Sequence, residues 1–73
     1  MNLSESNENN KYKIIKNLSA NPLKQRLLSM GFIKNTEIYI LIKNKKVLKV
    51  KILNSTVVLR IEEAKFIIIE KMN

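Results

Sequence analysis

The side chains that most often carry chemistry in proteins are scarce in this 73-residue chain. It contains no histidine and no cysteine. The commonest general base, the commonest nucleophile and the preferred ligands of zinc, copper and iron are therefore missing. Glu62 and Glu63 are adjacent, but in a turn two such side chains need not converge on one point. A solvated turn accounts for them better than a catalytic carboxylate pair.

The remaining candidates for chemistry lack the partners they would need. A single glycine cannot build the glycine-rich loop that binds phosphates. No base is available to activate a serine such as Ser4, Ser19, Ser29 or Ser55 as a nucleophile. We therefore expect no enzyme, no catalytic residue, no metal ligand and no cofactor. Such a domain should act by binding another molecule.

Length and hydropathy limit the architecture to one small domain. A chain of this size buries only about 60% of its unfolded surface, and without cysteine no disulfide can add to its stability. The longest apolar run, Ile38–Ile42, is far below the roughly 20 residues of a membrane helix. Residues 1–10 are polar and unlike a signal peptide. These features predict a cytoplasmic chain with a disordered polar tail over 1–10 and a domain over 11–73.

The formal net charge of +8 has two interpretations. A basic surface attracts nucleic acid, anionic lipid or an acidic protein. The lysines are scattered, however, and accompany many asparagines and isoleucines, as codons rich in A and T would supply. Nucleic-acid sites are more often rich in arginine and aromatic rings, and this chain has two arginines and four such rings. A nucleic-acid-binding small β-barrel stays an alternative.

Residues 21–31 carry the signals of one short helix. Asn21 suits the capping position, Pro22 the first helical position and Gly31 the left-handed residue after the last turn. A helix of about nine residues is unstable alone and must dock an apolar face on the rest of the domain. The residues that share this face are Leu23, Leu27 and Met30.

Period-two patterns predict strands elsewhere. The expected strands are 11–16, 37–43, 47–52, 56–61 and 65–70, with a turn over Asn44–Lys46, a two-residue hairpin turn at Asn54–Ser55 and a helical turn at Glu62–Ala64. The fold class is therefore mainly β. We predict a small SH3-like barrel of about five strands with one short helix after the first strand. A five-stranded OB-fold is the main rival, although its helix usually lies between later strands.

Two phrases in the chain resemble the FeoA family. The first is Leu27-Leu28-Ser29-Met30-Gly31-Phe32, which matches the family's basic, leucine-bearing helix with its terminal glycine. The second is Val57-Val58-Leu59-Arg60 followed by Glu62-Glu63-Ala64 and the isoleucine-rich segment 66–69. Order and spacing agree over residues 11–71. The chain departs from the family at three turns, where Lys34-Asn35, Asn44-Lys45-Lys46 and Asn54-Ser55 replace residues rich in proline and glycine. Asparagine tolerates positive φ and can substitute there.

The resemblance implies an SH3-like barrel and a role in bacterial ferrous iron uptake. Proteins of this family look like small cytosolic accessory subunits of FeoB, a membrane transporter with a GTPase domain. The fold also resembles the C-terminal domain of iron-dependent repressors of the diphtheria-toxin-repressor type. Because this chain has no histidine or cysteine, we expect an indirect role through contact with the cytosolic part of a FeoB-type transporter.

Leu28 and Phe32 are the candidate partner-binding residues. Leu28 lies beside the apolar face of the predicted helix and Phe32 follows its end, so both could anchor a partner at the margin of the core. The alternative is that both extend the core. The lysines of residues 43–51 could steer an acidic partner or form a solvated face. Self-association also stays open, whereas a peptide groove of the SH3 type would be poorly supplied with aromatic rings.

Overall fold

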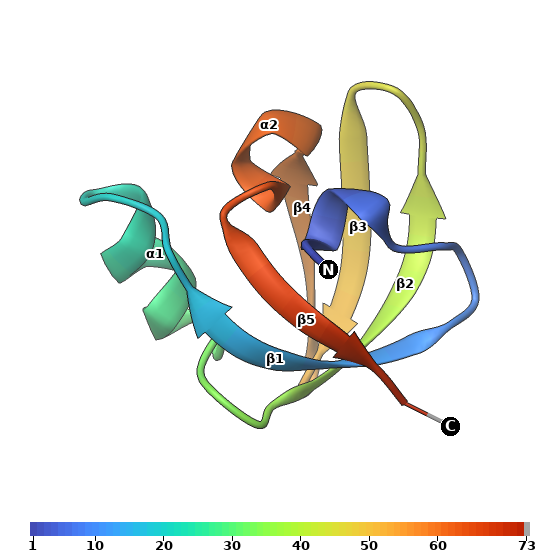
Figure 1. The fold of residues 1–73 in the computed structure, drawn as a ribbon, viewed down its shortest axis with the longest axis horizontal. Coiled ribbons are helices and arrows are strands. Elements are labelled where there is room, and N and C mark those ends of the chain that lie inside the picture. Colours follow the sequence, from blue (N-terminus) through green and yellow to red (C-terminus); the bar gives the residue numbers. More distant parts are fainter. Residues whose placement is uncertain (73) are drawn as a thin grey trace.

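The computed structural model describes residues 1–72, in which five strands and two short α-helices surround one apolar core (Figure 1). In chain order the elements are the 3₁₀ turn η1 (Leu3–Glu5), β1 (Lys11–Asn17), α1 (Leu23–Ser29), β2 (Glu37–Lys43), β3 (Val47–Ile52), β4 (Ser55–Arg60), α2 (Ile61–Ala64) and β5 (Ile67–Lys71). The prediction of a mainly β fold with a short helix after the first strand is confirmed.

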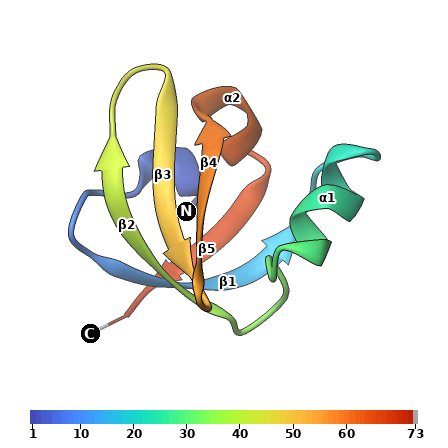
Figure 2. The same cartoon turned by 180° about the vertical axis from the view of Figure 1, so that it is seen from behind.

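The strands form one antiparallel sheet in the order β4-β3-β2-β1-β5. Strand β1 belongs to both halves of this sheet, because residues 11–13 pair with β2 and residues 12–17 pair with β5. A bulge between Ile14 and Lys16 bends β1 between these two pairings. Figures 1 and 2 show β1 and β5 crossing the layer of β2, β3 and β4. Within residues 1–72 no pairing joins β4 to β5, so the barrel is not closed by strand pairing.

The inner faces of the strands supply most of the core. In β3 the predicted alternation is confirmed, since every second side chain is buried. The buried strand residues are Tyr12 and Ile14 of β1, Ile38 and Ile40 of β2, Leu48, Val50 and Ile52 of β3, Val57 and Leu59 of β4, and Ile67 and Ile69 of β5. Burying apolar side chains of this size contributes about 1.5–3 kcal/mol each, and this burial holds the small barrel together.

Strand β2 departs from its predicted alternation near its end. Ile40 pairs with Val50, but the next paired residue, Ile42, lies opposite Lys49. Leu41 is therefore the extra residue of a bulge, and Ile42 is turned outward with 46% of its surface exposed. Period-two patterning cannot reveal a bulge, because the inserted residue is itself apolar.

The C-terminal end of α1 forms the glycine turn that the sequence predicts. Gly31 has a φ of +99°. The Phe32 N–H donates to the Leu27 carbonyl at 3.0 Å and the Gly31 N–H donates to the Leu28 carbonyl at 3.1 Å. These two bonds define the Schellman motif, which commonly turns an apolar residue back toward the helix. Phe32 is accordingly fully buried.

The N-terminal end of α1 differs from the prediction. Pro22 occupies the capping position, and no side chain accepts a capping hydrogen bond there. The carbonyls of Ala20 and Pro22 accept from the N–H groups of Lys24 and Arg26 instead, so the Asn21 side chain is not needed as a cap. Met30 lies beyond the last helical residue and is 37% exposed, whereas Leu27 is buried and Leu23 packs against the core.

The predicted turns are partly confirmed. The helical turn expected at Glu62–Ala64 is α2, and Asn35 adopts the expected positive φ, at +75°. The β3–β4 hairpin turns one residue earlier than expected, because Ile52 pairs with Ser55 and leaves Leu53 and Asn54 as the loop. The left-handed residue of that loop is Leu53, with a φ of +54°.

Residues 1–10 do not form the disordered tail that the sequence predicts. Leu3 is fully buried in the core, and η1 lies beside α2 (Figures 1 and 2). The Ile69 N–H donates to the Met1 carbonyl at 2.9 Å, and the Lys43 N–H donates to Glu8 Oε2 at 2.8 Å. The prediction failed because one buried leucine and a series of backbone bonds leave little trace in composition.

Candidate functional site

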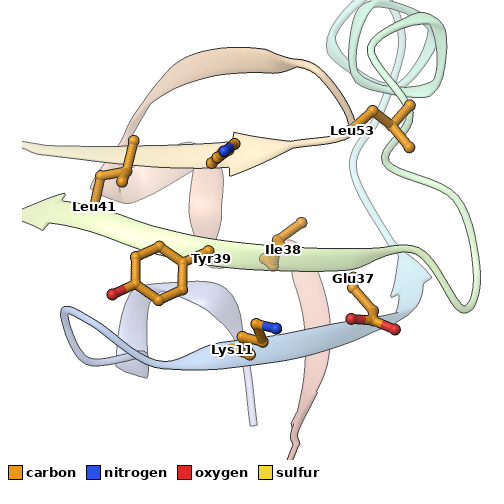
Figure 3. A pocket seen from close by; sticks show the side chains of 7 residues that line it. Lys11, Glu37, Ile38, Tyr39, Leu41 and Leu53 are labelled. Atoms are coloured by element: carbon orange, nitrogen blue, oxygen red, sulfur yellow. The ribbon is translucent and has the colours of Figure 1, made fainter.

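A hollow of about 430 Å³ opens on the outer face of the sheet (Figure 3). Its lining comes from β1, β2, β3 and the β3–β4 turn. The lining residues are Lys11, Glu37, Ile38, Tyr39, Leu41, Lys51 and Leu53. Figure 3 shows Leu41 and Leu53 at opposite ends of the hollow, with Tyr39 and Lys11 between them. We call this feature the outer hollow.

The pairing of the strands determines which side chains lie in the middle of the outer hollow. Lys11 of β1 lies opposite Tyr39 of β2, and Tyr39 lies opposite Lys51 of β3. Directly opposed side chains on one face of an antiparallel sheet have Cβ atoms about 4.5–5.5 Å apart. The aromatic ring is therefore flanked on both sides by a lysine. The Tyr39 hydroxyl donates to Asn9 Oδ1 at 3.3 Å, which ties the ring to the N-terminal segment.

The two ends of the outer hollow depend on irregular backbone. Leu41 is the extra residue of the β2 bulge, and bulges commonly redirect a side chain near functional sites. Leu53 lies in the two-residue loop after β3 with 67% of its surface exposed, the highest fraction among the exposed large apolar side chains of the described residues. The sequence around Leu41 does not indicate a bulge, and the sequence around Leu53 does not indicate an exposed loop leucine.

The outer hollow is apolar in the middle and basic at its walls. Among residues 1–72 the ion pairs are Arg26–Glu63 and Arg60–Glu62, so neither Lys11 nor Lys51 is paired with a carboxylate of that part of the chain. Glu37 is the one acidic group of the lining. It begins β2 opposite Lys13 and lies two residues before Tyr39, on the same face of the strand. This arrangement can take an apolar side chain together with a negatively charged group.

A second, larger hollow of about 530 Å³ lies between the β2–β3 turn and α2. Its lining residues are Lys45, Lys46, Val47, Arg60, Ile61, Glu62 and Lys65. Arg60 is 3.8 Å from Glu62, and both side chains are 74% exposed. A surface ion pair of this kind contributes little, and the hollow lacks an exposed apolar anchor. The second hollow is therefore the weaker candidate for a binding site.

The structure separates the two residues that the sequence predicts as partner contacts. Phe32 is fully buried beneath the Schellman turn, so the prediction of an exposed anchor is wrong for this residue. Leu28 is only partly buried on α1, and its surface is available for contact. Neither residue lines the outer hollow. The residues that sequence reasoning missed are Tyr39, Leu41 and Leu53.

No group of three or more histidine, cysteine, aspartate or glutamate residues that could hold a metal ion occurs within residues 1–72. The helices in that range are also too short to cross a membrane. The fold and the outer hollow together define a small β-barrel of the SH3-like class with an exposed surface of mixed apolar and basic character.

Comparison with known proteins gives the family. The family model described as the FeoA domain matches residues 1–71, and the chain therefore belongs to the FeoA domain family, as the sequence predicts. No curated protein matched the chain.

Solved structures agree with this assignment. A FeoA-like protein from Clostridium acetobutylicum is 27% identical, with a TM-score of 0.86 over 100% of this chain and 87% of that one. The zinc complex of FeoA from Stenotrophomonas maltophilia, described as a prokaryotic SH3 domain protein, is 29% identical, with a TM-score of 0.82 over 96% and 89% of the two chains. A manganese-dependent transcriptional repressor shares only the fold, at 18% identity and a TM-score of 0.87, over 97% of this chain and 40% of that one.

Proposed function

We propose that this protein is a cytoplasmic accessory protein of bacterial ferrous iron uptake and acts by contact with the cytosolic part of a FeoB-type transporter. The observation that carries the proposal is the FeoA domain match over residues 1–71. The Stenotrophomonas maltophilia relative is itself described as a candidate activating factor for ferrous iron transport. Membership of this family associates the chain with ferrous iron transport.

In this proposal the chain works by binding and not by catalysis or by carrying iron. The absence of histidine and cysteine from the sequence supports an indirect role, because these residues are the usual bases and soft ligands. The exposed part of Leu28 on α1 is proposed as one contact with the transporter, and the outer hollow supplies a second surface of suitable character.

The proposal is tested by titrating the full chain into the purified cytosolic part of the FeoB-type transporter from the same organism. Calorimetry should show saturable binding in at least one nucleotide state of the GTPase domain. An absence of binding without nucleotide, with GDP and with a GTP analogue would contradict it. A parallel titration with single- and double-stranded DNA at low ionic strength tests the nucleic-acid alternative, for which affinity must fall steeply with salt.

A further inference from the structure

We propose that Leu53 and the outer hollow form the docking surface for an acidic segment of the transporter's cytosolic part that also carries a large apolar side chain. This inference rests on the proposed function, because it specifies where and by what chemistry the partner binds. Leu53 would be the apolar anchor at one end, and Lys11 and Lys51 would hold the carboxylates of the segment.

The backbone of Leu53 is the first argument. Its φ of +54° is in the left-handed region, which residues with a Cβ rarely adopt and which suits glycine or asparagine. Asn54 is the next residue, so a residue better suited to this conformation is one position away. A leucine held in a strained conformation and 67% exposed stabilises the fold little. Strained residues that persist on a surface are often part of a functional site.

The side chain of Leu53 also contacts the end of α1. Its Cδ1 atom would lie 2.8 Å from a Cβ on Gly31, so the leucine packs over the glycine that ends α1. The leucine therefore lies against Gly31 although most of its surface faces solvent. A side chain that is partly held in place before binding loses less conformational freedom when a partner docks on it.

The positive charge of the outer hollow favours an acidic segment as its binding partner. Lys11 and Lys51 flank the Tyr39 ring and form no ion pair with a carboxylate of residues 1–72. A segment with carboxylates would therefore meet these two lysines and one acidic residue, Glu37, so the lining carries a net positive charge. A second copy of this chain is disfavoured, because it also carries a formal net charge of +8 and like charges oppose association. The volume of about 430 Å³ falls within the roughly 300–1,000 Å³ of typical binding pockets.

The deciding experiment compares the affinities of Leu53→Asn and the wild-type chain for the transporter's cytosolic part. Asparagine accepts the left-handed backbone, so the urea midpoint should stay level or rise while the affinity falls about tenfold. Leu18→Asn is the matched control, because Leu18 is 52% exposed and lies outside the outer hollow. Its affinity should equal that of the wild type.

Charge reversal provides the second measurement. Lys51→Glu should lower the affinity several-fold at low salt, and the loss should shrink as salt is added. Lys65→Glu, in the second hollow, carries the same charge change and should have the smaller effect.

Unchanged affinity in Leu53→Asn, or equal losses in the two lysine variants, would overturn the docking surface and leave the proposed function intact. A wild-type chain that does not bind the transporter would overturn both. A change confined to self-association, measured by sedimentation, would assign the surface to a second copy and also overturn the inference.

Discussion

Leu53 and Gly31 meet where the β3–β4 hairpin passes the end of α1, and the leucine occupies space that any side chain at position 31 would enter. A Cβ on Gly31 would lie 2.8 Å from Leu53 Cδ1 and 3.4 Å from Leu53 Cγ. Both residues have a positive φ, at +99° and +54°. Two left-handed residues from separate parts of the sequence therefore lie against each other.

Replacing Gly31 with alanine should destabilise the fold by about 1–2 kcal/mol, the usual cost of a left-handed conformation for a residue with a Cβ. The contact with Leu53 should add little to this cost, because the leucine end is exposed and can move away. Urea unfolding of Gly31→Ala measures the loss in the free energy of unfolding.

The double variant Gly31→Ala/Leu53→Ala separates backbone strain from side-chain contact. If strain dominates, Gly31→Ala should cost the same in the Leu53→Ala background, within about 0.5 kcal/mol. Recovery of most of the lost stability in the double variant would instead assign the cost to the clash.

Truncation of Leu3 to alanine should cost about 2 kcal/mol or more. Leu3 is fully buried between α2 and β5, and removal of a buried leucine side chain loses both apolar burial and packing. Chemical unfolding provides the measurement. Leu18→Ala is the control, since Leu18 is 52% exposed and its loss should stay within about 0.5 kcal/mol. Equal, small effects in both variants would mean that residues 1–10 do not contribute to the fold in solution.

Sequence reasoning predicted the parts of this fold that repeat a local pattern. The alternating residues of β3 and the terminal glycine of α1 each carry a periodic or conformational signal. Leu3 carries none, because a single leucine among polar residues looks the same whether it is buried or not. The bulge at Leu41 and the left-handed Leu53 arise from how the strands pair, which is a property of the assembled sheet. The outer hollow was therefore not predictable from the residues that line it.

Phe32 shows the same limit at a predicted site residue. A residue that follows a helix-ending glycine can lie exposed at the margin of the core or be the buried apolar residue of a Schellman motif. Phe32 is the buried residue of such a motif, because its N–H donates to the Leu27 carbonyl and its side chain is fully buried. Phe32→Ala should therefore cost about 3–5 kcal/mol of stability, measured by thermal or urea unfolding. A stable Phe32→Ala variant that had lost only transporter binding would restore the original prediction.

Asn44 should stabilise the β2–β3 turn by about 1 kcal/mol through its side chain. Its Oδ1 accepts from the N–H groups of Lys46 at 2.8 Å and Val47 at 2.9 Å, and a typical hydrogen bond contributes about 0.5–1.5 kcal/mol. Asn44→Ala removes both bonds and should lower the urea midpoint. Asn44→Asp keeps the acceptor and should remain close to the wild type. A similar loss in both variants would show that the amide N–H groups of Asn44, and not its oxygen, matter.

Glu63 should contribute more stability than its partner Arg26, although the two form one ion pair. Glu63 Oε2 lies 3.3 Å from Arg26 Nη2 and joins α2 to α1, while Glu63 Oε1 accepts from the Arg60 N–H at 3.0 Å at the start of α2. Because the Arg26 side chain is 54% exposed, Arg26→Ala should cost less than about 1 kcal/mol. Glu63→Ala also removes the cap and should cost about 1 kcal/mol more. In unfolding experiments, added salt should reduce the ion-pair part of both losses and leave the excess for Glu63→Ala. Equal losses at every salt concentration would mean that the bond to Arg60 contributes nothing.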